Sequence, residues 1–206
     1  MVKAITYGYK GGDRYLERLK KAIDCVEIRG FSGETLEYTE GISALVDLFL
    51  SCKRSRKTIY ICGNGGSAGI AQHMTGDFLK NGGLHTYSLY EQTVLTCISN
   101  DLSYEYVFSK QLELAAGAGE VLIAISSSGE SENIVKAIRT IRDFGGRVIT
   151  LTGFRPDNRI REMGDINIYV PEEHYGIVES VHNIILQQIV DEIVQAEGVA
   201  LKMDEE

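Results

Sequence analysis

The chain has 206 residues, of which 44% are hydrophobic, and its formal net charge is −8. This length fits one α/β domain with a helical extension, and the acidic balance excludes a general nucleic-acid surface, which needs clustered Lys and Arg. The four cysteines share no Cys-x-x-Cys spacing and lie mostly in apolar stretches, which is typical of buried free thiols in a reducing compartment. Because no leader and no membrane-spanning apolar run is found, we expect a cytoplasmic protein without a membrane or direct nucleic-acid partner.

Residues 1–56 are predicted to form a helical arm. Residues 1–11 should be loosely fixed, and apolar residues then recur at helical spacing over about 13–27 and 35–52, with Gly30 and Gly33 between the two helices. The basic run at the end of the second helix suits the helix dipole. Two amphipathic helices cannot both cover a sheet that later helices also cover, so we expect them to be buried against another subunit.

Strand and helix patterns alternate over residues 57–197. The predicted strands are 58–62, 85–90, 121–126, 147–151 and 166–170, and the predicted helices are 67–80, 92–98, 104–116, 131–144 and 174–196. Such alternation predicts a doubly wound, five-stranded parallel sheet of the α/β class. Residues 198–206 should form a frayed tail.

Two loops of small residues, 62–67 and 126–131, each follow a predicted strand and precede a predicted helix. Glycine lets the backbone approach a ligand, and a helix N-terminus provides unpaired N–H groups, so this arrangement is typical of an anion site. Neither loop has a dinucleotide or P-loop pattern. We interpret four serines, Ser67, Ser126, Ser128 and Ser131, as a site for a small phosphate monoester. Ordinary βα turns with serine caps are the alternative.

Two pairs of ionisable residues have helical spacing: His73 with Asp77, and Glu179 with His182. Such pairs on facing helices suit a divalent metal, with zinc the plausible ion. The structural alternatives are a local hydrogen bond for His73 and a core-facing position for His182.

The loop at residues 62–68, followed by Ala71-Gln72-His73, resembles the first loop and helix of the sugar isomerase (SIS) domain family. Residues 125–134 resemble the Ser-x-Ser-Gly-x-Ser phosphosugar loop of that family, and Asn100-Asp101 and 148–153 fit the same pattern. The similarity extends from the second helix to about Ile193. Within the family it is greatest to the phosphoheptose isomerase branch, and it implies a flavodoxin-like fold with an N-terminal helical layer.

The resemblance implies an aldose–ketose isomerase of phosphosugars, with sedoheptulose 7-phosphate as the leading substrate and an enediol intermediate. It also implies a homotetramer with active sites between subunits, and zinc in some members. By the same resemblance the four serines hold the phosphate and Asn64 and Asp101 bind sugar hydroxyls, while Gly65 and Ser127 belong to the same substrate-binding loops.

The catalytic positions depart from the family pattern. Where the family has His-x-x-x-Glu, this chain has His73 and Asp77. Where the family has Gln-x-x-His and then a second His five residues on, this chain has Glu179, His182 and Gln187. These five residues are the catalytic candidates, and all of them except His182 are tentative metal ligands. Asn81 also replaces a family Arg.

Aldose–ketose interconversion needs a base that moves a proton between adjacent carbons and a group that polarises their oxygens. Asp77 or Glu179 is the candidate base, and His73, with a metal if one binds, is the polarising group. The departures leave two alternatives open: a non-catalytic phosphosugar-binding tetramer that acts as a scaffold or regulator, and an isomerase of another sugar phosphate. The retained ionisable residues favour the enzyme.

Overall fold

The computed structural model describes residues 12–198, and the predicted loose segment 1–11 and the predicted tail beyond residue 198 lie outside this range. The N-terminal elements are α1 (Gly12–Asp24), β1 (Glu27–Arg29), β2 (Thr35–Leu36) and α2 (Tyr38–Ser55). The following elements are β3 (Ile59–Gly63), α3 (Gly66–Lys80), β4 (Thr86–Ser88), α4 (Gln92–Asp101), η1 (Tyr104–Tyr106), α5 (Ser109–Ala115), β5 (Val121–Ser126), α6 (Glu132–Asp143), β6 (Arg147–Thr152), η2 (Arg159–Glu162), β7 (Ile166–Tyr169) and α7 (Tyr175–Ala196).

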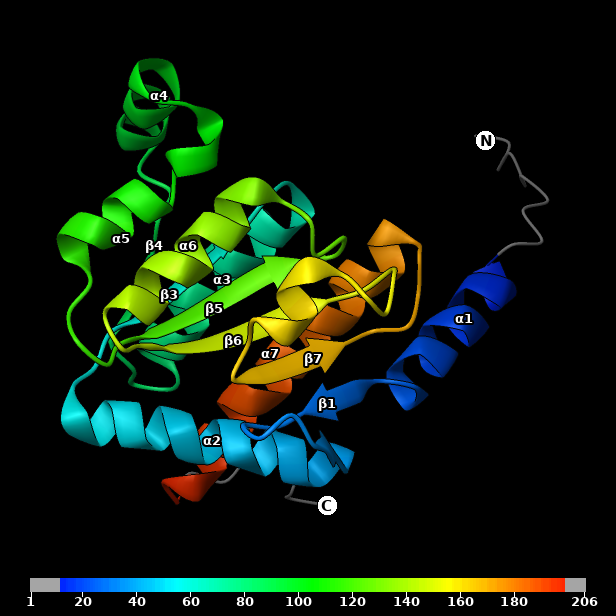
Figure 1. Ribbon diagram of the computed structural model, residues 1–206. Helices are drawn as coiled ribbons and strands as arrows, with labels where there is room; N and C mark the ends of the chain where they lie inside the picture. The colour runs from blue at the N-terminus through cyan, green and yellow to red at the C-terminus, as the bar shows by residue number, and fades with distance from the viewer. Residues whose placement is uncertain (1–11, 199–206) are drawn as a thin grey trace, which may run out of the picture.

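The sheet has the order β2-β1-β7-β6-β5-β3-β4 (Figure 1). The five strands from β3 to β7 are parallel, which confirms the doubly wound prediction. Their order is the flavodoxin-like one, in which the direction of winding reverses between β3 and β5. Ligands in such sheets bind at the carboxyl ends of the strands on either side of this reversal, where the two small-residue loops lie.

The prediction of only five strands was wrong, because β1 and β2 add two short antiparallel strands beside β7. Gly30 and Gly33 form the turn between them: the Gly30 N–H donates to the Glu34 carbonyl at 2.8 Å, and Gly33 has a φ of +81°. Glycine turns between short strands and glycine helix breaks look alike in sequence. The predicted helix 104–116 is also divided, into η1 and α5, with Val107 and Phe108 buried in the core between them.

Helices cover both faces of the sheet (Figure 1). One apolar core joins the sheet to α2, α3 and α7, and a second joins it to α5 and α6. Ile42, Leu45 and Phe49 of α2 are completely buried in the first core. The apolar face of α2 is therefore covered within its own chain, contrary to the expectation that both arm helices need another subunit.

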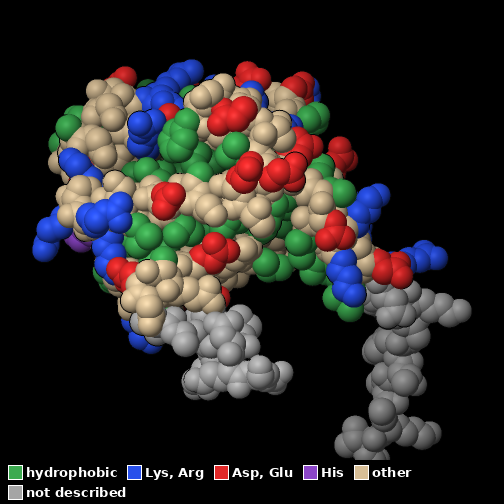
Figure 2. Space-filling model, turned by 90° about the horizontal axis from the view of Figure 1, so that it is seen from below, with side chains coloured by type: hydrophobic (Ala, Val, Ile, Leu, Met, Phe, Trp, Pro, Cys, Tyr) green, Lys and Arg blue, Asp and Glu red, His purple; other side chains and the backbone are tan. Residues whose placement is uncertain are grey.

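Hydrophobic side chains also remain exposed at the surface. On the face seen from below in Figure 2 they lie between acidic groups, and basic side chains gather toward the end at which α2 terminates. Among residues 12–198, no helix has the length and apolar character needed to cross a membrane.

Candidate active site

The two small-residue loops meet in a cavity of about 110 Å³ at the carboxyl ends of β3 and β5. We call this cavity the serine pocket; it is lined by Asn64, Ser67, Ser126, Ser127, Ser128, Ser131, Tyr175 and Glu179. All four serines predicted for the phosphate line it, together with Ser127, Asn64 and Glu179 from the remaining candidates.

The serine pocket is rich in unpaired hydrogen-bond donors. The Ser127 hydroxyl is buried and has no hydrogen-bond partner in the described part of the chain. Ser131 is the N-cap of α6 but makes no side-chain cap hydrogen bond, and α3 begins at the same pocket. The first N–H groups of a helix have no intrahelical partner, and the helix dipole makes this end positive. Hydroxyls and two helix N-termini together suit a phosphate dianion.

Glycine is needed at two positions of the first loop for different reasons. Gly65 has a φ of +56°, a conformation that is strained for other residues. Gly66 lies directly against the carboxylate of Glu179, and a Cβ atom at position 66 would clash with that carboxylate. The absence of a side chain at Gly66 therefore allows α7 to bring a carboxylate to the start of α3.

Asn64 lines the pocket but is held by two residues that the sequence did not single out. Its amide group exchanges two hydrogen bonds of 2.9 Å with the Asn133 amide, and its Oδ1 also accepts a bond of 2.8 Å from the Tyr104 hydroxyl. These bonds fix the loop after β3 to the start of α6 and to η1.

Asp101 is not among the residues that line the serine pocket. It is the last residue of α4, is exposed, and accepts a hydrogen bond of 2.9 Å from the neighbouring Asn100 side chain. Figure 1 shows α4 projecting away from the sheet.

Three candidates meet further along α3, where this helix packs against α7. The Gln187 amide nitrogen donates to Asp77 Oδ2 at 2.6 Å and lies 3.0 Å from His73 Nε2. His73 Nε2 and Asp77 Oδ2 are 3.2 Å apart. We call these residues the α3–α7 cluster. With the neutral imidazole protonated on Nδ1, the two amide hydrogens of Gln187 can satisfy both neighbours.

Glu179 and His182 have very different surroundings although they are three residues apart. Glu179 is half-buried with no hydrogen-bond partner within residues 12–198, and burial raises the pKa of its carboxyl group. His182 is fully buried, and its Nε2 donates to the Thr152 carbonyl at 3.0 Å. Its Nδ1 has no partner among residues 12–198, and burial lowers the pKa of the imidazole to about 4. His182 therefore lies in the core and belongs neither to the serine pocket, which Glu179 lines, nor to the α3–α7 cluster. Within the part of the chain that the structure describes, no three His, Cys, Asp or Glu residues group as metal ligands.

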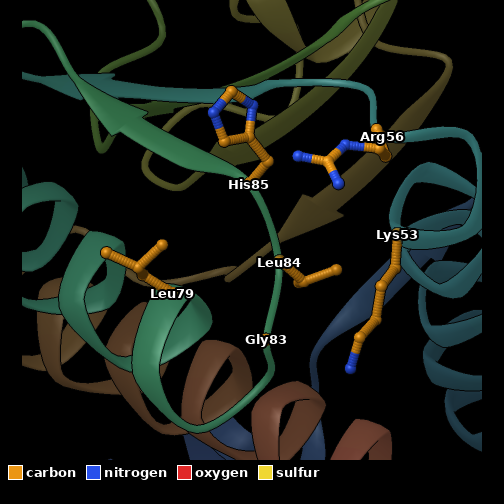
Figure 3. A pocket seen from close by; sticks show the side chains of 6 residues that line it. All are labelled: Lys53, Arg56, Leu79, Gly83, Leu84 and His85. Atoms are coloured by element: carbon orange, nitrogen blue, oxygen red, sulfur yellow. The ribbon is translucent and has the colours of Figure 1, made fainter.

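A second cavity, of about 290 Å³, lies at the opposite ends of β3 and β4 (Figure 3). Lys53, Arg56 and His85 come together there with two leucines. Lys53 Nζ is already paired with the Glu197 carboxylate at 2.5 Å and with the Gly82 carbonyl at 3.0 Å, and His85 contacts the Thr58 hydroxyl. This cavity contains none of the candidate residues.

Sequence reasoning missed Tyr175 as a pocket residue. It lies four residues before Glu179 on α7, so both side chains project from the same helix face. That spacing was the available signal, because any helix that brings Glu179 to the pocket also brings position 175.

Comparisons with known proteins agree with this geometry. The SIS domain family model matches residues 32–153. The chain is 34% identical over 177 residues to a phosphoheptose isomerase from Clostridium acetobutylicum, which covers 82% of this chain and 88% of the relative. It is 36% identical over 165 residues to one from Helicobacter hepaticus, which covers 77% and 83%. The solved phosphoheptose isomerase GmhA from Neisseria gonorrhoeae superposes with a TM-score of 0.77 at 29% identity, over 89% of this chain and 96% of that structure.

Proposed function

The chain belongs to the SIS domain family, and from this we propose that it is a phosphoheptose isomerase that interconverts sedoheptulose 7-phosphate and the corresponding aldoheptose 7-phosphate. One structural observation supports the isomerase reaction in addition to the family membership. The serine pocket and the α3–α7 cluster lie along the same two helices, so that an anion site and a proton-transferring group can contact opposite ends of one substrate.

The spacing of the two sites suits a long sugar chain. His73 and Asp77 follow Ser67 by six and ten residues, or about 9 to 15 Å along α3 at 1.5 Å per residue. An extended carbon chain with bonds of 1.52 Å advances about 1.3 Å per bond, so seven carbons and a phosphate ester reach roughly 10 Å. With the phosphate among the serines, carbons 1 and 2 would reach His73, and the Asp77 carboxylate lies within 3.2 Å of the His73 Nε2 atom.

In the proposed reaction Asp77 is the base. From the ketose, it removes a proton from carbon 1, the C–H electrons form the double bond between carbons 1 and 2, and the carbonyl oxygen on carbon 2 gains a proton. The resulting enediol loses the proton of the carbon 1 hydroxyl, and Asp77 returns its proton to carbon 2, which leaves the aldose. His73 and the Gln187 amide contact the two oxygens, where His73 moves the proton and Gln187 donates a hydrogen bond.

Zinc fits the α3–α7 cluster as an alternative form of the proposal, in which His73 and Asp77 would hold the ion and would no longer carry the proton. The 3.2 Å between His73 Nε2 and Asp77 Oδ2 suits neighbouring ligands of a tetrahedral ion, since bonds of about 2.0–2.2 Å place such ligands roughly 3.4 Å apart. Gln187 would be the third ligand after its amide turns to present its oxygen. A bound zinc would polarise the substrate oxygens. Glu179 lies eight residues before Gln187, about 12 Å away along α7, and is outside this set.

We also propose that the active protein is a cytoplasmic homotetramer. The α3–α7 cluster is open on one side, with the His73 side chain more than half exposed. A neighbouring face of α7 forms a cavity of about 410 Å³ that includes the exposed Ile184. An apolar residue in a hollow beside a site is a feature of subunit interfaces. All four cysteines are free thiols, which agrees with a reducing compartment, but only Cys52 and Cys62 are buried as expected, whereas Cys25 and Cys97 are exposed.

Turnover of sedoheptulose 7-phosphate by the purified protein, with and without added zinc, tests the proposal. The matched control is Asp77→Asn, which keeps the shape of the side chain but removes the base. We expect the variant to lose turnover by about a thousandfold, within the range for loss of general base catalysis. No turnover by the native protein, with phosphosugar binding retained, would instead favour another sugar phosphate or the non-catalytic scaffold.

A further inference from the structure

One wall of the serine pocket is aromatic. Tyr175, at the start of α7, lines the pocket with 59% of its surface exposed, and its ring packs edge-on against Phe154 with centroids 4.6 Å apart and planes at 74°. Its hydroxyl makes no hydrogen bond within residues 12–198, while its ring is held in place. A fixed ring with a free donor beside an anion pocket is the arrangement of a ligand contact.

Phe154, which packs against the Tyr175 ring, has a strained backbone conformation. Its φ is +57°, in the left-handed region that a bulky residue rarely adopts. Two hydrogen bonds impose this conformation: the Phe154 N–H donates to the Glu172 carbonyl at 2.9 Å, and the Tyr169 hydroxyl donates to the Phe154 carbonyl at 2.7 Å. Strain of this kind persists only where the surroundings over-determine the residue, and it gathers at ligand sites.

A residue of α1 also anchors the segment between Phe154 and Tyr175. Glu172 accepts two hydrogen bonds, of 2.6 and 2.5 Å, from the Arg18 guanidinium of α1. The same carboxylate accepts from the backbone N–H groups of Glu173 and His174, immediately before α7. The strand end, the loop and α1 therefore all fix the first residue of α7.

We propose that Tyr175 is a substrate-binding residue whose hydroxyl donates a hydrogen bond to the phosphate, and that Phe154 is the positioning residue that holds its ring over the serine pocket. The inference deepens the proposed function, because it concerns the phosphate end of the same site. It concerns binding and not proton transfer, since the reacting carbons lie at the far end of the substrate.

The test compares Tyr175→Phe with the native protein by two measurements. One is the dissociation constant of inorganic phosphate by titration calorimetry, and the other is kcat and KM for sedoheptulose 7-phosphate. A lost hydrogen bond to a charged group should weaken phosphate binding about tenfold or more. KM should rise by a similar factor with kcat nearly unchanged, because binding to the remote phosphate is the same in ground and transition states.

Tyr87→Phe is the control, since Tyr87 is exposed on the edge strand β4 and is not a residue of the serine pocket. Unchanged phosphate affinity in Tyr175→Phe would overturn the proposal for Tyr175. If the native protein binds phosphate but does not turn over sedoheptulose 7-phosphate, the effect of Tyr175→Phe on phosphate binding still tests this inference, and only the proposed isomerase activity fails.

Phe154 is tested by three substitutions that separate its ring from its backbone. Phe154→Tyr keeps the ring and should bind phosphate like the native protein. Phe154→Ala and Phe154→Gly both lose the ring and should weaken phosphate binding alike, whereas the glycine variant, which tolerates a positive φ, should melt at the higher temperature of the two. Phosphate affinity that follows melting temperature, and not the presence of the ring, would contradict a positioning role.

Discussion

The two carboxylates proposed near the substrate differ in what surrounds them. Asp77 accepts a short hydrogen bond from Gln187 and lies beside His73, whereas Glu179 has no hydrogen-bond partner among the described residues and faces the serine pocket. Burial raises the pKa of Glu179, and a bound phosphate dianion would disfavour its charged form further. A protonated Glu179 has nearly the shape and the donor capacity of the glutamine that the family pattern has at this position.

We therefore predict that Glu179→Gln keeps kcat/KM within about tenfold of the native value, or roughly 1.4 kcal/mol of transition-state stabilisation. The measurement is steady-state isomerisation of sedoheptulose 7-phosphate, with Asp77→Asn assayed alongside. Loss of turnover in Glu179→Gln, with turnover retained in Asp77→Asn, would show that Glu179 and not Asp77 is the catalytic base.

His182 gives a second prediction, on stability. Because its pKa is about 4 in the folded protein against 6.5 in the unfolded chain, the unfolded state binds the additional proton first as the pH falls. The folded protein should lose stability from about pH 6.5 down to about pH 4, by about 3 kcal/mol in total. His182→Gln can still donate to the Thr152 carbonyl but cannot titrate, so urea unfolding across this range should show a smaller pH dependence.

The serines and His182 show how far single residues could be predicted. The sequence allowed five serines to be placed in one pocket, because each of the two loops directly follows a strand. The two strands are parallel neighbours, so they end at the same edge of the sheet. The direction of His182 could not be predicted, because positions 179 and 182 lie only about 60° apart around a helix and a small rotation decides which one faces the core.

At the scale of elements, the Asn64–Asn133 pair joins the two βα units that form the serine pocket. Asn133 is buried, and its two hydrogen bonds to Asn64 are among the few polar links between the loop after β3 and α6. Asn133→Ala leaves the Asn64 amide without this partner. We expect a loss of about 1–3 kcal/mol in the free energy of unfolding, measured by denaturant titration.

A control for this prediction is Tyr104→Phe, which removes only the third bond to Asn64 from an exposed residue. Its effect on unfolding should be smaller, because water can replace the lost hydroxyl. Equal losses in the two variants would show that the buried amide pair has no special role.

The parallel elements were predictable and the antiparallel hairpin was not, for a physical reason. The strand β5 is apolar at five of its six residues and β6 carries Val, Ile and Leu, because helices cover both faces of these buried strands, and these short apolar runs are visible in the sequence. The strands β1 and β2 have three and two residues, too few to show an alternating pattern, and their pairing depends on the distant β7.

At the scale of the whole molecule, the proposed tetramer makes Ile184 a test position. It is 41% exposed on α7, in the cavity next to the α3–α7 cluster. Ile184→Glu would place a charge in a buried interface and should shift the protein toward smaller species in light scattering coupled to size exclusion. Leu114→Glu, at an 81% exposed position on α5, is the control and should leave the mass unchanged. A native mass in Ile184→Glu would exclude this face from the assembly.

The two borders of the sheet restrict how copies of the chain can associate. One border is β2, with two residues, and the other is β4, with three. So short a row of free backbone N–H and C=O groups is a poor template for a strand from another molecule. The chain should therefore resist edge-to-edge polymerisation into fibrils even at high concentration, and the proposed tetramer should be held by side-chain contacts and not by added strands.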